Sequence, residues 1–179
     1  MNAQELRLVD PTAELERAYT EMVLDFRAAG EPFHQGYYDD LADFPAFVRK
    51  LLGQARGENL PEGYVPCNHY WLVRNGTTVT GTSRLRHRLI PTLKNEGGHI
   101  GYDIRPSERG KGYATRLLAM TLEKARAMGI PRALVTCDDD NAASARVIEK
   151  NGGRLAGRGV SDRTGKAVRR YWIDLGRQP

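Results

Sequence analysis

One continuous stretch, residues 98–115, constrains the fold more than any other part of the sequence. Residues Gly98–Ile104 are β-prone and end at Arg105-Pro106, and a glycine-rich turn follows. From about Gly112 to Met128 apolar residues recur at steps of three and four, and Gly129 ends the pattern. A chain that passes from a strand through a tight turn into a long helix is typical of a mixed α/β protein.

The remaining pattern supports this fold class, because strand-like and helix-like segments alternate without an internal repeat. Asn75-Gly76 supplies the positive φ angles of a tight hairpin turn between two β-prone runs. A loop is expected from Gly53 to Pro66. The expected strands are 6–9, 69–73, 79–85, 98–104, 133–137, 154–160 and 168–174, and the expected helices are 15–29, 41–52, 112–128 and 141–150.

The glycine-rich turn has the properties of an anion site. Small residues at Gly110, Gly112 and Ala114 let a ligand approach the backbone, whose unpaired N–H groups open the helix. Arg109 and Lys111 add positive charge. The turn does not fit a P-loop, which needs a hydroxyl residue after the lysine, nor the dinucleotide pattern GxGxxG. An ordinary loop that carries basic residues is the alternative.

Charge is divided unevenly along the chain. Residues 1–66 hold 6 basic and 12 acidic side chains, so residues 67–179 hold 27 − 6 = 21 basic and 22 − 12 = 10 acidic ones. Residues 84–116, which include the glycine turn, carry 8 basic and 3 acidic side chains. This distribution favours an anionic ligand for the later part of the chain.

Length and composition limit the classes of protein. A chain of 179 residues fits one domain, 1–179. No apolar run approaches a membrane span and no leader pattern opens the chain, so we expect a cytoplasmic protein without a membrane partner. Cys67 and Cys137 form no metal-ligand pattern, and we expect neither a disulfide framework nor a metal site.

The sequence resembles the GCN5-related N-acetyltransferases (GNAT). Residues 109–114 (RGKGYA) match the signature R/Q-x-x-G-x-G/A of that superfamily, and a second motif places Asn141, Ser144 and Gly152 in register about 30 residues downstream. The resemblance extends over residues 6–175, and residues 13–66 match only in helical character. Residues 84–88 and 97–102 are similar to a poorly characterised subgroup of predicted acetyltransferases.

This resemblance implies a mixed, mostly antiparallel sheet of six to seven strands, splayed between the fourth and fifth, with about four flanking helices. It implies an acyltransferase that moves an acetyl group from acetyl-coenzyme A directly to a primary amine in a ternary complex. The backbone of Ile104 is expected to face the thioester carbonyl. The other implied coenzyme-binding residues are Arg105, Arg109, Gly110, Lys111, Gly112, Tyr113, Ala114, Thr115, Asn141 and Ser144.

For the general base, the resemblance points to His99, which holds the position where many relatives have a glutamate. A neutral imidazole can accept a proton near pH 7. Asp103 and Glu96 are alternative bases, and a histidine whose hydrogen bonds are satisfied within the strand is the alternative to any catalytic role.

For the acid that protonates the leaving thiolate, the sequence departs from the family. Relatives with a tyrosine carry it seven residues after the asparagine, where this chain has Ile148. Ser144 matches a serine used by a branch that modifies protein N-termini. The alternative is a serine favoured in the first turn of a helix by local hydrogen bonding.

The acceptor is expected to be a small-molecule or peptide amine. Tyr37, Tyr38, Phe44 and Phe47 lie where the family shapes its acceptor pocket, although core packing is an alternative for them. The acidic first third suits a cationic acceptor, and a homodimer is common among relatives. Two other functions stay open: an acyl-coenzyme A sensor without turnover, suggested by Ile148, and a nucleic-acid binder. The second is disfavoured because stacking aromatic residues are not interleaved with the basic ones.

Overall fold

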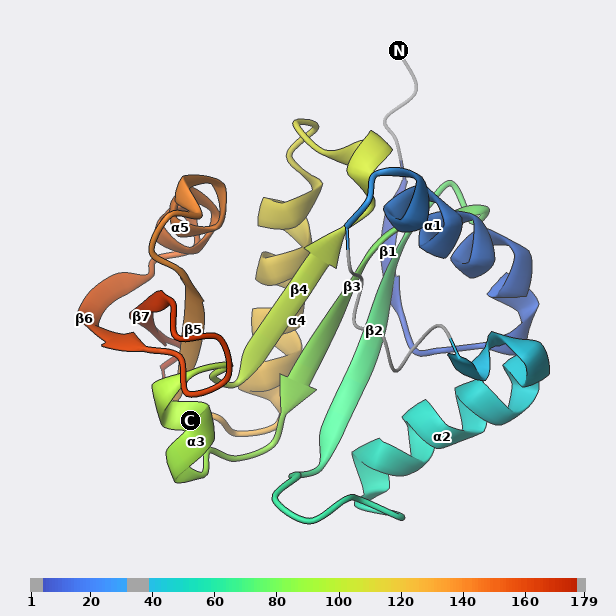
Figure 1. Cartoon of the computed structure of the whole chain (residues 1–179). Coiled ribbons are helices and arrows are strands. Elements are labelled where there is room, and N and C mark those ends of the chain that lie inside the picture. The colour runs from blue at the N-terminus through green and yellow to red at the C-terminus, as the bar shows by residue number, and fades with distance from the viewer. Residues whose placement is uncertain (1–4, 32–38, 177–179) are drawn as a thin grey trace.

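A seven-stranded sheet organises the protein, which we describe from a computed structural model over residues 5–31 and 39–176 (Figure 1). Its strand order is β1-β2-β3-β4-β5-β7-β6. Neighbouring strands pair antiparallel except for β4 and β5, which pair parallel. The strands are β1 (Leu6–Val9), β2 (Cys67–Arg74), β3 (Thr78–Arg86), β4 (Ile100–Ile104), β5 (Arg132–Asp138), β6 (Arg154–Val160) and β7 (Ala167–Asp174).

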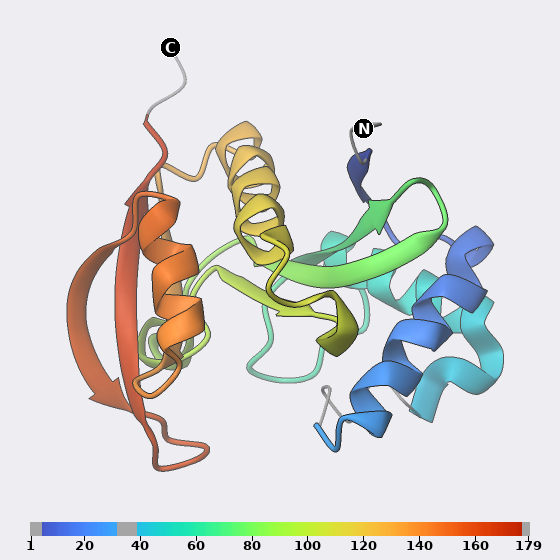
Figure 2. The same cartoon turned by 90° about the horizontal axis from the view of Figure 1, so that it is seen from above.

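The helices lie on both faces of the sheet. As Figure 2 shows, α1 and α2 lie together on one face of the β1–β4 half, and α4 lies on the other. The short α5 packs between α4 and β5. The helical segments are α1 (Glu16–Ala28), α2 (Phe44–Arg56), α3 (Pro91–Asn95), α4 (Tyr113–Ala127) and α5 (Ala142–Lys150).

An aromatic cluster anchors α1 and α2 to the sheet. Tyr19 of α1 lies with its ring centroid 4.6 Å from that of Trp71 on β2, and Phe44 and Phe47 of α2 pack against Tyr19 at 5.7 and 5.4 Å. Both phenylalanines are almost fully buried. Such burial contributes about 1.5–3 kcal/mol for each large apolar side chain. Phe44 and Phe47 are therefore core residues, as the packing alternative proposed. Tyr37 and Tyr38 lie outside the described residues.

The turn between β2 and β3 confirms the sequence signal. Asn75 and Gly76 both have positive φ, 50° and 72°, which is the conformation that the hairpin requires. The helix α2 differs from the expectation, because it continues through Gly53 to Arg56 and ends at Gly57 in the left-handed conformation. The loop after α2 therefore begins one helical turn later than predicted.

The sheet opens between its two central strands. In the register of β4 and β5, Ile100 faces Val135 as the one recorded pair within the described residues. Beyond this pair the strands lean apart toward the end of β4 (Figure 1). This confirms the expected mixed sheet that splays between the fourth and fifth strands. Within the described ranges, no helix is long and apolar enough to cross a membrane.

Candidate active site

Where β4 diverges from β5, the backbone groups of β4 beyond Ile100 have no recorded strand partner on the β5 side within the described residues. The N–H of Arg105 donates to Thr80 O on β3 at 2.9 Å. Successive N–H groups of a strand point to opposite sides, so the N–H of Ile104 points away from β3 and toward β5. The carbonyl of Ile104 accepts a bond of 3.2 Å from Arg109 Nε. Ile104 thus offers a donor at the place where the resemblance implies a thioester carbonyl.

The glycine turn forms an open cradle next to this point. Gly110 and Gly112 have φ of 76° and 81°, and beyond their chain neighbours no heavy atom of residues 5–31 or 39–176 lies within 4 Å of where a Cβ would stand on either. Gly112 is the N-cap of α4 and no side chain caps the helix. The first N–H groups of α4 therefore have no partner within the helix and face an accessible surface. This is the geometry of an anion site at a helix N-terminus.

The two cations of the turn are held by carboxylates. Arg109 makes a bidentate pair with Glu31, at 2.7 Å for each bond, and lies over the ring of Phe26. Lys111 Nζ donates to Glu108 at 3.0 Å and to the carbonyl of Ser107 at 2.9 Å. The charge of both side chains is thus largely compensated, and the backbone of the turn is the better-supported anion ligand.

Asp25 of α1 supplies a second carboxylate, which fixes the other end of the same turn. One oxygen of Asp25 accepts bonds from Arg105 Nε at 2.9 Å, from Ser107 N at 3.1 Å and from Ser107 Oγ at 2.6 Å. The bond from Ser107, followed by the contact with Arg105, lowers the pKa of Asp25. Sequence reasoning missed both Asp25 and Glu31, because no local pattern relates them to a turn some 80 residues away.

Three predicted coenzyme residues enter the helix α4 itself. The side chain of Tyr113 is buried in the core, where its hydroxyl accepts a bond of 3.4 Å from Arg74. Ala114 and Thr115 follow in the first turn. What these three can offer an anion is their backbone N–H groups.

At the N-terminus of α5 the structure brings a hydroxyl pair together. Asn141 caps the helix by accepting the N–H of Ser144 at 2.9 Å. The Oγ of Ser144 lies 2.8 Å from the phenol of Tyr102, which comes from β4. Burial raises the pKa of Tyr102 to about 12. Ile148 of α5 is fully buried in the core. The phenol near this helix comes instead from β4.

A thiol lies beside the same serine. Cys137 is buried at the end of β5, and burial raises the pKa of its thiol, while the nearby charge of Arg169 and then the contact with Ser144 act in the opposite direction. The Ser144 hydroxyl thus has a phenol within hydrogen-bond distance and a thiol among its neighbours.

Asp103 and Arg84 form an ion pair on the opposite face of β4, which is turned toward α1 and α2. Arg84 Nη2 lies 2.9 Å from Asp103 Oδ2, and the two side chains are 12% and 27% exposed. Asp103 also acts electrostatically on Glu31 at the end of α1. A carboxylate therefore lies beside the splay on the face where an acceptor could approach.

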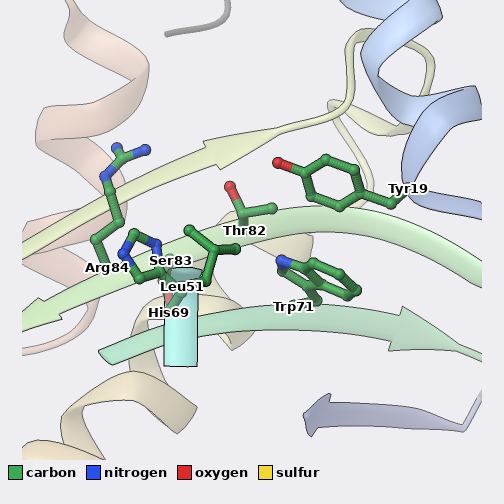
Figure 3. A pocket seen from close by; sticks show the side chains of 7 residues that line it. All are labelled: Tyr19, Leu51, His69, Trp71, Thr82, Ser83 and Arg84. Carbon is green, nitrogen blue, oxygen red and sulfur yellow. The ribbon is translucent and has the colours of Figure 1, made fainter. Parts of the chain in front are cut away.

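The cavity next to Arg84 is small. Figure 3 shows the side chains that line it, which include Tyr19, His69 and Trp71. The side chain of Arg84 also contributes to the lining, and its guanidinium group points away from the others. Its volume is about 10 Å³, which accommodates roughly one water molecule. An acceptor side chain does not fit there without movement.

His99 is tied into the sheet rather than directed at the opening. The ring Nδ1 of His99 accepts the backbone N–H of Leu134 at 3.0 Å, and the backbone N–H of His99 donates to Leu134 O at 2.7 Å. Burial lowers its pKa to about 4. With Nδ1 accepting, the neutral ring carries its proton on Nε2 and keeps no free lone pair. This geometry disfavours His99 as the general base.

Glu96 is also engaged elsewhere. Its carboxylate accepts bonds from Ser161 Oγ at 2.5 Å and from Arg163 at 3.2 Å. These contacts hold the turn between β6 and β7 against the end of α3. Of the three candidate bases, Asp103 is the one placed beside the splay on the acceptor face.

Comparison with known proteins agrees with this geometry. The sequence matches the model of the acetyltransferase (GNAT) domain over residues 6–154. No curated protein matches the sequence.

Solved structures of acetyltransferases share the fold. That of ribosomal-protein-S5-alanine acetyltransferase from Vibrio fischeri gives a TM-score of 0.74 at 16% identity and covers 100% of this chain and 97% of its own. Mycobacterium smegmatis RimJ in complex with CoA-disulfide gives 0.71 at 18%, covering 94% and 81%. RimL, a ribosomal L7/L12 α-N-protein acetyltransferase linked to coenzyme A through a cysteine disulfide, gives 0.67 at 22%, covering 97% and 95%.

Proposed function

The chain belongs to the GNAT acetyltransferase family, and from this premise we propose that it transfers the acetyl group of acetyl-coenzyme A directly to the N-terminal α-amine of a peptide or protein. The observation that carries the proposal is the divergence of β4 from β5 directly beside the glycine cradle. In this proposal the extended thiol arm lies where the two strands diverge, and the cradle accepts its diphosphate.

The residues present fit acetyl-coenzyme A. The diphosphate is bound by the N–H groups at the start of α4, where Gly110 and Gly112 leave the space that a Cβ would fill. The Ile104 N–H donates to the carbonyl oxygen that gains negative charge during transfer. Bound in this way, the coenzyme supplies a thioester, which an amine can attack without an acyl-enzyme.

Asp103 receives the acceptor. Its carboxylate faces α1 and α2, so it attracts an ammonium group and lets the amine lose its proton to Asp103 or to adjacent water. The pair with Arg84 fixes the orientation of the carboxylate. On the opposite side of the strand, the Ser144 hydroxyl donates to the sulfur as the thiolate leaves.

The choice of an N-terminal amine draws on the relatives. RimL is an α-N-protein acetyltransferase and the Vibrio protein acts on ribosomal protein S5. An N-terminal ammonium is a cation, which agrees with a carboxylate beside the splay. Ser144, at the third position of α5, matches the serine of the branch that modifies protein N-termini.

The test is release of coenzyme A from acetyl-coenzyme A over a panel of acceptors. The panel contains short peptides that begin with Ala, Ser, Gly or Met, the same peptides with a formylated α-amine, Nα-blocked lysine, and spermidine. We expect turnover with at least one free peptide and none with its formylated partner. Turnover only with spermidine or blocked lysine would contradict the proposed acceptor class.

A further inference from the structure

The hydroxyl pair between β4 and α5 assigns a task to a residue outside the glycine motif. The phenol of Tyr102 lies 2.8 Å from Ser144 Oγ and 3.4 Å from Ser144 O. The two residues are 42 positions apart in the sequence. Tyr102 belongs to β4, and Ser144 belongs to α5, which follows β5 on the other side of the splay. Tyr102 is packed against the core that surrounds Leu118 and Ile148, so its ring cannot swing freely.

The direction of the hydrogen bonds follows from the number of protons available. Either oxygen of the pair can donate, and Ser144 has one hydroxyl proton, so it can donate to a sulfur atom only while Tyr102 supplies the proton of the bond between them. The lone pairs of Ser144 Oγ are then free to accept the phenol proton of Tyr102. The chain of donors runs from Tyr102 to Ser144 and from Ser144 to a sulfur atom.

Tyr102 also keeps its proton over the working range of pH. Burial raises its pKa to about 12, and the bond to Ser144 offsets this only in part. A phenol that stays neutral acts as a fixed donor and not as a proton source for a thiolate. Its effect on the reaction must therefore pass through Ser144.

We propose that Tyr102 is a positioning residue that holds the Ser144 hydroxyl with its proton directed at the coenzyme sulfur. This phenol belongs to β4, whereas α5 has the buried Ile148 at the position where relatives carry a tyrosine. This inference rests on the proposed function, because Ser144 has a task only if a thioester sulfur comes to lie beside it.

The experiment compares Tyr102→Phe, Ser144→Ala and the double variant. Tyr171→Phe is the matched control, since the phenol of Tyr171 also contacts α5 but reaches Glu149 at 3.3 Å, away from Ser144. Binding of acetyl-coenzyme A is measured by calorimetry and melting temperature checks the fold. The first readout is the thiolate absorbance of bound coenzyme A as a function of pH, corrected with the coenzyme-free protein, and it needs no acceptor.

We expect the thiol of bound coenzyme A to have a higher pKa in Tyr102→Phe and in Ser144→Ala than in the unaltered protein, by roughly one pH unit. With the best peptide of the panel, kcat falls roughly tenfold in each single variant while KM for acetyl-coenzyme A is unchanged. The double variant is no slower than Ser144→Ala, because the two hydroxyls act in series. Tyr171→Phe behaves like the unaltered protein.

Distinct results separate failure of this inference from failure of the proposed function. Tyr102 does not position Ser144 if Tyr102→Phe has the same thiol pKa and the same kcat as the unaltered protein, while Ser144→Ala has a raised thiol pKa and a lowered kcat. Independent losses that multiply in the double variant would also overturn the inference, because they indicate a separate structural effect. Absence of saturable coenzyme binding in the unaltered protein would defeat the proposed function itself.

Discussion

Substitution of Gly112 by leucine tests the coenzyme cradle most selectively. Gly112 has φ of 81° and open space around its Cβ position among the described residues, so the Cβ of a leucine meets none of them but the residue must adopt the left-handed conformation. That conformation costs about 1–2 kcal/mol in a residue with a Cβ. The side chain then occupies the surface through which a diphosphate would reach the first N–H groups of α4.

The same helix provides a matched control at its other end. Gly129 has φ of 76°, and in the part of the chain that the structure describes no heavy atom beyond its chain neighbours lies within 4 Å of its Cβ position. Gly129→Leu therefore has the same backbone cost without touching the cradle. A change of about 1–2 kcal/mol lowers the melting temperature of a chain of this size by roughly 2–8 °C, and we expect similar decreases for both variants.

Coenzyme affinity should separate the two variants. Loss of two hydrogen bonds from N–H groups to a charged phosphate removes about 3–6 kcal/mol, which raises Kd at least roughly 100-fold. We expect this for Gly112→Leu in calorimetry with acetyl-coenzyme A, and a Kd within about twofold of the unaltered protein for Gly129→Leu. Unchanged affinity in a folded Gly112→Leu would refute the assignment of the cradle.

Three further predictions concern charged and titratable groups. Asp25→Asn should raise Kd for acetyl-coenzyme A roughly fivefold by loosening the glycine turn. Glu21→Gln, on the exposed side of the same helix, should leave Kd unchanged. Equal affinities of the two variants for acetyl-coenzyme A in calorimetry would contradict this prediction. Asp103→Asn should lower kcat at least tenfold, whereas His99→Gln should keep the acidic limb of the kcat profile; loss of that limb in His99→Gln would restore His99 as the base. Because burial lowers the pKa of His69 to about 3 and of His99 to about 4, the unfolded chain binds protons first as the pH falls below about 6.5. The free energy of unfolding in urea should therefore fall by about 2–4 kcal/mol from pH 7.5 to pH 5, and a constant value would contradict the burial of these rings.

Local sequence signals predicted the elements that depend on local physics. Asn75-Gly76 marked the hairpin because few residues tolerate positive φ. The apolar residues that recur after Gly112 marked α4. The segment α3 was not predicted, because five residues are too few for a helical period to be visible. Pro91 at its first position was the available signal.

The long-range contacts of the site could not be predicted from the sequence. The bonds of Asp25 to Ser107 and of Tyr102 to Ser144 join residues 82 and 42 positions apart, so they depend on how the sheet brings α1, β4 and α5 together. His99 stands in a favourable sequence position for a base. Its Nδ1 accepts a backbone N–H of β5, however, and this contact exists only once the two central strands have paired.

The central claim is that the splay between β4 and β5 brings acetyl-coenzyme A and an N-terminal amine together. The most direct measurement is tandem mass spectrometry of the best peptide of the panel after incubation with the protein and acetyl-coenzyme A. We predict one added acetyl group on the α-amine, absent when the coenzyme is omitted and strongly reduced with Gly112→Leu. Saturable coenzyme binding without acetylated product from any peptide, or acetylation confined to side-chain amines, would contradict the account.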